Sequence, residues 1–154
     1  MLRLRKGTMV KYGGLVDLGS GVSVDETSDG IPQLVAAEGQ FDNGTKTADF
    51  TIDWKNGKVQ RVTLGNKGSA FTVTLNNGKA GDTYTLEVVQ DGTGSRTVGS
   101  WVSSEPSTTV IWPSGTPPTL TTTANRADVF TFKRDDVPAT KKYLGQTYGL
   151  NYAV

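Results

Sequence analysis

The sequence predicts an all-β fold of the sandwich or barrel type, and three observations support that prediction. The 154 residues include 19 glycines and 6 prolines. Glycine and proline together thus make up about a sixth of the chain, against a usual share of roughly 12%. Both residues disfavour helices. Apolar residues recur at every second position in several segments, as expected for half-buried strands. Turn-forming sequences recur about every ten residues, a spacing typical of sandwiches and barrels.

Four segments carry the alternating pattern. In the first, Phe50, Ile52 and Trp54 share one face of the predicted strand, and the residues between them face the other way. The pattern repeats in residues 71–75, 84–88 and 129–132. Threonine fills many of the alternate positions. Because its β-branched side chain fits a pleated surface and still bonds to water, we expect the threonines to face solvent.

Turn sequences follow three of these predicted strands. They read Lys-Asn-Gly-Lys at 55–58, Asn-Asn-Gly-Lys at 76–79 and Asp-Gly-Thr-Gly at 91–94. Asn-Gly tolerates the positive φ of tight hairpin turns. The turns therefore predict hairpins, which join antiparallel strands.

Residues 1–45 differ from the rest of the chain. Glycine-rich and polar breaks at 13–14, 19–21 and 27–30 divide this segment into pieces too short to build a core of their own. Its apolar residues still alternate loosely, so two interpretations remain open: an extended arm that uses a partner's surface, or a small sheet. We expect an N-terminal anchoring segment over 1–45 and a β-sandwich domain over 46–154.

Composition excludes several classes of function. The chain has no Cys and no His, which removes thiolate nucleophiles, imidazole bases and Cys/His zinc sites. Its formal net charge of +1 disfavours a nucleic-acid partner, because such proteins carry a basic excess. No stretch reaches the roughly 18 apolar residues of a membrane span. The sequence predicts neither a cofactor nor a metal.

The order and spacing of many short stretches carry a resemblance that begins at Phe50. These stretches are 50–57 (FTIDWKNG), 60–64 (QRVTL), 71–73 (FTV), 80–86 (AGDTYTL), 90–98 (QDGTGSRTV), 112–115 (WPSG), 118–121 (PTLT), 124–132 (ANRADVFTF) and 149–152 (GLNY). Together they resemble β-sandwich modules in the structural appendages of tailed bacteriophages, meaning head-fibre, decoration and tail-fibre proteins.

The resemblance implies a jelly-roll-like antiparallel β-sandwich that assembles as a homotrimer on the exterior of a virion, after synthesis in the host cytoplasm. We expect a non-enzymatic head-decoration or head-fibre protein, with the major capsid protein or another virion protein as partner. The alternative is a tail-fibre or baseplate module that binds a receptor, including a host surface glycan.

The basic N-terminus is the candidate anchor. Leucines and basic residues alternate there, so a strand with one charged face could join a capsid sheet or contact an acidic patch. A frayed basic end is the alternative. The candidate anchoring residues are Leu2, Arg3, Leu4, Arg5, Lys6 and Lys11.

Three tryptophans raise the question of sugar binding, since exposed aromatic rings stack on pyranose rings. Trp54 alternates with apolar neighbours and Trp112 precedes a proline, so we expect both in the core or an interface. Trp101 stands among polar residues in a predicted Ser-rich loop, residues 99–109. Trp101 is therefore the candidate carbohydrate contact.

Without His and Cys, two catalytic designs remain open: a Ser-Lys nucleophile, which leaves no local sequence pattern here, and a pair of acids. Glycosidases place two carboxylates roughly 5–9 Å apart, and Asp135-Asp136 or Asp49 with Asp53 are candidates for a depolymerase. A solvated turn better explains the adjacent pair, so no catalytic residue is predicted. Residues 91–95 lack the further carboxylates of a calcium loop and are expected to form a turn.

Overall fold

The computed structural model describes residues 22–26, 32–36, 39–137 and 140–154. The chain divides into two units, residues 1–39 and residues 40–154. In the first unit β1 (Val22–Glu26) and β2 (Pro32–Ala36) form an antiparallel pair with Val22 opposite Ala36. Of the two interpretations left open for the N-terminal segment, the described residues form a small sheet.

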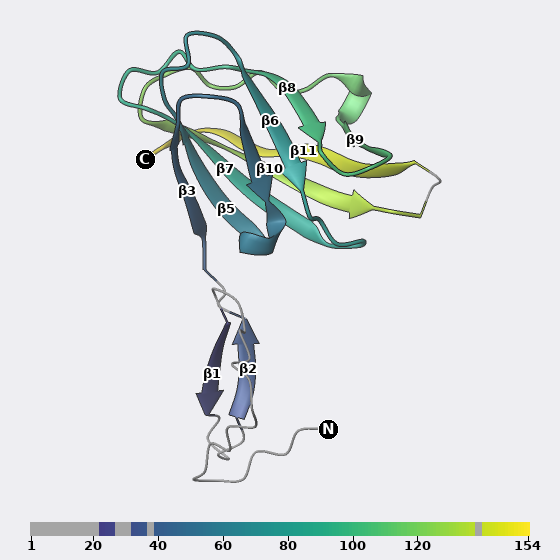
Figure 1. Cartoon of the computed structure of the whole chain (residues 1–154). Coiled ribbons are helices and arrows are strands. Elements are labelled where there is room, and N and C mark those ends of the chain that lie inside the picture. The colour runs from purple at the N-terminus through teal and green to yellow at the C-terminus, as the bar shows by residue number, and fades with distance from the viewer. Residues whose placement is uncertain (1–21, 27–31, 37–38, 138–139) are drawn as a thin grey trace. The chain divides into compact units, whose positions relative to one another are not determined.

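The second unit contains two sheets, and the all-β prediction is confirmed: strands make up 55% of the structure, with almost no helix. The six-stranded sheet has the order β3-β5-β7-β10-β11-β9 and the three-stranded sheet the order β4-β6-β8 (Figure 1). The first sheet comprises β3 (Phe41–Lys46), β5 (Val59–Leu64), β7 (Thr83–Gln90), β10 (Arg126–Asp135), β11 (Lys141–Ala153) and β9 (Thr108–Ile111). The second comprises β4 (Phe50–Asp53), β6 (Phe71–Asn76) and β8 (Val98–Ser103).

The chain alternates between the two sheets from β3 to β9. Because every connection in this stretch crosses to the other sheet, neighbouring strands within a sheet run in the same direction. β3, β5 and β7 pair in parallel, as do β4, β6 and β8, and β9 pairs in parallel with β11. Only the β7–β10 and β10–β11 pairs of this unit are antiparallel among the described strands. The predicted antiparallel sheet is therefore wrong for most pairs.

The turn sequences bend the chain as expected, but they do not make hairpins. Asn77 has φ +61° and Gly94 has φ +71°, in the left-handed region. Residues 54–58 lead from β4 to β5, and 77–82 lead from β6 to β7, in each case to the other sheet. The flanking strands each have a buried face, and the crossing brings those faces into one core. The turn sequence by itself therefore does not distinguish a hairpin from a crossing.

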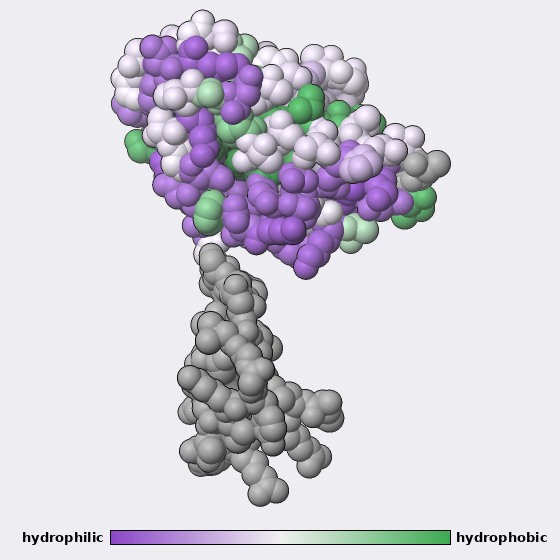
Figure 2. Space-filling view, in the orientation of Figure 1, coloured by the Kyte–Doolittle hydropathy of each residue, from purple (hydrophilic) through white to green (hydrophobic). Residues whose placement is uncertain are grey.

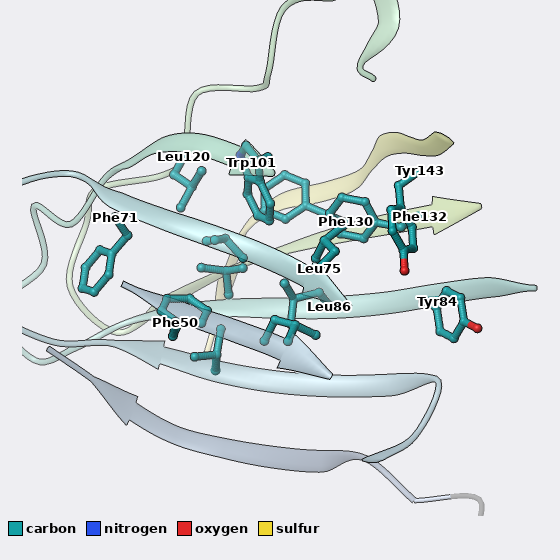
Figure 3. Close-up of a cluster of buried hydrophobic side chains, with 14 of the residues drawn as sticks. Phe50, Phe71, Leu75, Tyr84, Leu86, Trp101, Leu120, Phe130, Phe132 and Tyr143 are labelled. Carbon is teal, nitrogen blue, oxygen red and sulfur yellow. The ribbon is translucent and has the colours of Figure 1, made fainter. Parts of the chain in front are cut away.

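A single cluster of buried side chains draws on both sheets (Figure 3). Ile52 and Leu75 from the smaller sheet and Leu86 and Phe132 from the larger one are fully buried. The ring of Trp54 stacks on Tyr84 with centroids 4.5 Å apart. The predicted strands at 50–54, 71–75, 84–88 and 129–132 thus exist, with their predicted apolar faces in the core.

Buried polar side chains fix the points where the chain leaves a sheet. The Gln60 amide donates to the carbonyls of Asp53 (2.7 Å) and Gly57 (3.0 Å). Gln90 donates to the Arg96 carbonyl (2.8 Å) and accepts from the Arg96 N–H (2.9 Å). These bonds satisfy backbone groups that no sheet partner reaches.

The predicted domain boundary at 45/46 falls at the end of β3. That strand pairs with β5 and belongs to the second unit, which begins at Gln40. The sequence of β3, Phe-Asp-Asn-Gly-Thr-Lys, is short of apolar residues because β3 is an edge strand and most of its residues are exposed or half-buried. No alternating signal marks it.

Candidate functional site

Exposed apolar side chains concentrate on β11, the last strand of the chain, which lies next to the edge strand β9 of the larger sheet. Leu144, Tyr148, Leu150 and Tyr152 of β11 are 39%, 73%, 44% and 45% exposed, and Ile111 of neighbouring β9 is 38% exposed. We call these five residues the apolar stripe. Hydrophilic or neutral residues cover most of the face of the second unit that is visible in Figure 2, so a grouping of exposed apolar residues stands out from the general surface. Such a grouping is the usual mark of an interaction surface.

Strand alternation explains why Leu144 belongs to the stripe, and a bulge explains the exposure of Tyr148. Tyr143 and Gly145 of β11 point into the core and are buried, so Leu144 between them points outward. Leu144 pairs with Ile111 on one side and with Lys133 of β10 on the other. Tyr148 is the extra residue of a bulge, since Gly149 and Thr147 face the consecutive residues Val129 and Phe130. Bulges re-aim side chains, and Tyr148 is the most exposed aromatic of the stripe.

A groove of about 500 Å³ adjoins the stripe on the outer side of the six-stranded sheet. Ile111, Leu144 and Pro113 supply apolar walls, and its polar lining includes Lys133 and Gln146. The Trp112 ring also lines it, and a Cβ at Gly145 would come within 2.9 Å of that ring. Glycine at 145 thus allows Trp112 to pack against β11.

The edges of both sheets are poorly suited to pairing with another strand. β3 carries a bulge in which the Gly44 N–H donates to the Asp42 carboxylate (2.8 Å) and Gly44 has φ +69°. β8 has a register shift beside Gly99, and β4 and β9 are four residues long. Bulges and short strands protect edges from edge-to-edge association. The sheet edges described in the second unit are therefore less suited to association than its faces.

A buried ion cluster lies at one end of the second unit, centred on Arg134. The Arg134 side chain is 2% exposed, and its Nη2 lies 2.7 Å from Glu105 Oε2. Its Nε forms an ion pair with Asp136, and its guanidinium lies 4.8 Å from the centre of the Tyr143 ring. The cluster joins the β8–β9 connection to the β10–β11 hairpin. A buried guanidinium requires such partners, because Arg cannot release its proton.

The other oxygen of Glu105 organises a third segment. Tyr143 Oη donates to Glu105 Oε1 (2.5 Å) and accepts from the Gly78 N–H (2.8 Å). A Cβ at Gly78 would lie 2.3 Å from Tyr143 Oη, so only glycine leaves room for the phenol there. Burial and the neighbouring Glu105 carboxylate raise the pKa of Tyr143 far above its ordinary value. Tyr143 is therefore a neutral donor at physiological pH.

Sequence reasoning missed Arg134, although a signal was present. Phe130, Phe132 and Arg134 occupy successive inward positions of β10. The adjacent acids Asp135 and Asp136 indicate a solvated turn, but the strand alternation continues as far as Arg134, just before them. A charge at an inward position of a strand signals a buried pair.

The predicted anchoring residues Leu2, Arg3, Leu4, Arg5, Lys6 and Lys11 lie outside the described residues. Trp101 is described, and the prediction that it lies in a polar loop is wrong. It belongs to β8 and is 7% exposed. Its ring packs edge-on against Trp112 (5.4 Å) and Phe130 (5.5 Å). The ring is thus largely enclosed, although Trp101 also lines a groove of about 300 Å³ with Trp112 and Pro117; the carbohydrate contact at Trp101 stays a prediction.

The acidic residues that we considered for catalysis have structural partners. Asp136 pairs with Arg134, and Asp135 accepts from the Val137 N–H (3.2 Å). Asp49 accepts from the Thr72 N–H (2.6 Å) and pairs with Lys67. These carboxylates hold turns and strand ends together.

Asp91, in the 91–95 turn, has a similar structural role. It accepts from the N–H groups of Thr93 (3.0 Å) and Gly94 (2.8 Å) and pairs with Arg96 (2.9 Å). Among the described residues, no group of three or more acidic side chains is arranged to hold a metal ion.

Comparison of the chain with protein-family models, curated proteins and solved structures found no match. In the part of the chain that the structure describes, no helix has the length and apolar character needed to cross a membrane.

Proposed function

We propose that this chain is a structural subunit of a tailed-phage virion, a head-decoration or head-fibre protein on the outside of the particle. In this proposal the two sheets of the second unit form a virion-type β-sandwich that assembles as a homotrimer. The N-terminal segment, through Leu2 to Lys6 and Lys11, binds the major capsid protein or another virion protein. The order of short stretches from Phe50 onward supports this reading.

The apolar stripe is the observation that carries the proposal. Five exposed apolar residues gather on β9 and β11, while the sheet edges are bulged or short. An assembling structural protein needs a surface that loses free energy when it is covered, at roughly 25 cal/mol per Å² of apolar area. Protected edges limit association to a defined face and so prevent open-ended stacking.

Sedimentation of the full chain, alone and with purified capsids, tests the proposal. We expect a trimer that binds capsids, and we expect Leu144→Asp to dissociate it because a charge then enters the covered face. Val102→Asp is the matched control, since Val102 is 37% exposed and Leu144 39%, and Val102 lies on β8 of the other sheet. Two results contradict the proposal: a wild-type chain that sediments as a monomer and does not bind capsids, or a trimer that the two substitutions dissociate to the same extent.

A further inference from the structure

Three Asn-Gly pairs occur in the second unit: Asn43-Gly44, Asn56-Gly57 and Asn77-Gly78. In such a pair the glycine nitrogen can attack the side-chain carbonyl carbon of the asparagine, because glycine has no Cβ to obstruct the approach. The reaction requires that the asparagine side chain rotate freely and that the glycine N–H leave its hydrogen-bond partner. The structure therefore ranks the three pairs by how firmly each is held.

Two of the pairs are held at both reacting groups. The Asn43 amide donates to Gln60 Oε1 (2.9 Å) and to the Arg61 carbonyl (3.0 Å), and the Gly44 N–H donates to the Asp42 carboxylate (2.8 Å). These bonds keep the amide and the attacking nitrogen apart.

The second pair is held in the same way. The Asn77 amide donates to Asp53 Oδ1 (2.8 Å). The Gly78 N–H donates to Tyr143 Oη (2.8 Å) and to Glu105 Oε1 (3.1 Å). Both reacting groups therefore have to break side-chain bonds first.

The third pair is held at neither group by a side chain. Asn56 is exposed, and within the described residues its side chain has no hydrogen-bond partner. The Gly57 N–H makes one long bond, 3.3 Å to the Trp54 carbonyl. Asn56 ends the short 3-10 turn between β4 and β5, and Gly57 follows with φ +139°.

We propose that Asn56 is a site of spontaneous modification, a conclusion that goes beyond the proposed virion role and does not depend on it. The Gly57 nitrogen gives up its proton and bonds to Asn56 Cγ. This new bond closes a five-membered succinimide ring. The Cγ–Nδ2 bond then breaks, and the amide nitrogen takes up the proton and leaves as ammonia. Water then opens either ring carbonyl to give aspartate or isoaspartate at position 56. No oxidant, reductant or enzyme takes part.

The product alters the crossing between the two sheets. Each event adds one negative charge between Lys55 and Lys58. Isoaspartate also lengthens the backbone by one atom, immediately before the Gly57 carbonyl that the buried Gln60 amide holds at 3.0 Å. We expect the lengthened backbone to strain the hydrogen bond between Gln60 and the Gly57 carbonyl, so the modification should destabilise the fold at the β4–β5 crossing over time.

Timed incubation of the folded full chain at mildly alkaline pH, followed by peptide mapping and isoaspartate labelling, tests the proposal. We expect Asn56 to react about 30-fold faster than Asn43 or Asn77, a ratio equivalent to about 2 kcal/mol. In the urea-unfolded chain the three pairs should react at similar rates, because the hydrogen bonds that separate them are gone. Asn56→Gln should lack the fast signal, since its longer side chain closes a six-membered ring far less readily.

Two results would overturn the proposal. One is a folded chain in which Asn43 or Asn77 reacts as fast as Asn56. The other is an unfolded chain in which Asn56 still reacts faster than Asn43 and Asn77 by the same factor as in the folded chain. The rate difference would then come from the local sequence and not from the fold.

Discussion

Replacing Glu105 by glutamine tests whether the buried ion cluster stabilises the second unit. The substitution preserves shape but removes the charge that faces Arg134 at 2.7 Å. Hydrogen bonds to charged groups contribute about 1.5–3 kcal/mol. Breaking a buried pair costs about 3–5 kcal/mol when the remaining charge has no partner. Because Asp136 still pairs with Arg134, we expect Glu105→Gln to lower the free energy of unfolding by about 2 kcal/mol.

Urea denaturation followed by tryptophan fluorescence measures this change in the full chain. All three tryptophans, Trp54, Trp101 and Trp112, lie in the second unit and are buried, so the signal reports that unit. Glu87→Gln is the matched control. Glu87 lies 3.9 Å from Arg61, and these two side chains are 18% and 35% exposed; Glu87 also accepts from the Gln40 amide (2.7 Å) at the surface. A surface pair of this kind contributes about 0–1 kcal/mol.

Equal losses in Glu105→Gln and Glu87→Gln would refute the reasoning. A double-mutant cycle gives a second check. Combined with Arg134→Met, Glu105→Gln should cost clearly less than it does alone, because the buried charge that needs the carboxylate is gone. Additive effects of the two substitutions would show that Glu105 and Arg134 do not interact.

Two further predictions concern pH. Because the pKa of Tyr143 is raised above its ordinary 10.0 by burial and by Glu105, the folded state keeps this proton after the unfolded chain has lost it. The contribution of Tyr143 to stability is thus retained below about pH 10 and falls above it. Tyr143→Phe lacks this titrating group, so its urea midpoint should drop less steeply than that of wild type between about pH 9 and pH 11. The pKa of Asp91 is lowered from 3.8, chiefly by its bond from Arg96, so its contribution exists above about pH 4 and is lost in acid. Asp91→Asn should therefore destabilise the chain at neutral pH, and its difference from wild type should shrink steadily as the pH falls below about 4. Urea midpoints at neutral and acidic pH measure this, and a difference that does not shrink contradicts the assignment.

The strands could be predicted from the sequence where the signal is local. Alternation in residues 50–54, 71–75 and 84–88 reports which side chains face the core, since a strand's faces repeat every two residues. The partner of each strand leaves no such signal. Asn-Gly at 77–78 produces its positive φ in a hairpin and in a crossing alike. The predicted antiparallel pairing is therefore wrong for most strand pairs, whereas the predicted core faces of these strands are confirmed.

Trp101 and Arg134 show the same limit at single positions. Trp101 is the only buried residue of β8, so no alternation marks that strand and its polar neighbours suggest a loop. Arg134 stands two and four residues after Phe132 and Phe130 and so faces the core as they do. Because it is charged, the sequence suggests an exposed position instead. In both cases the decisive partners, Phe130 for Trp101 and Glu105 for Arg134, come from elsewhere in the chain.

The polar side chains at the sheet crossings explain how this topology holds without cysteine or metal. Parallel strands joined by crossings make few local contacts, so loop closure opposes their formation. Gln60 and Gln90 are almost fully buried, and each bonds to backbone groups across a crossing. Asp128, also buried, accepts from the N–H groups of Thr121 (2.6 Å) and Asn151 (2.9 Å). An unsatisfied buried amide or carboxylate costs free energy, so an alternative register that moved these residues out of place would carry that penalty. The same groups that satisfy the backbone thus select this path of the chain over a hairpin meander with an identical pattern of apolar residues.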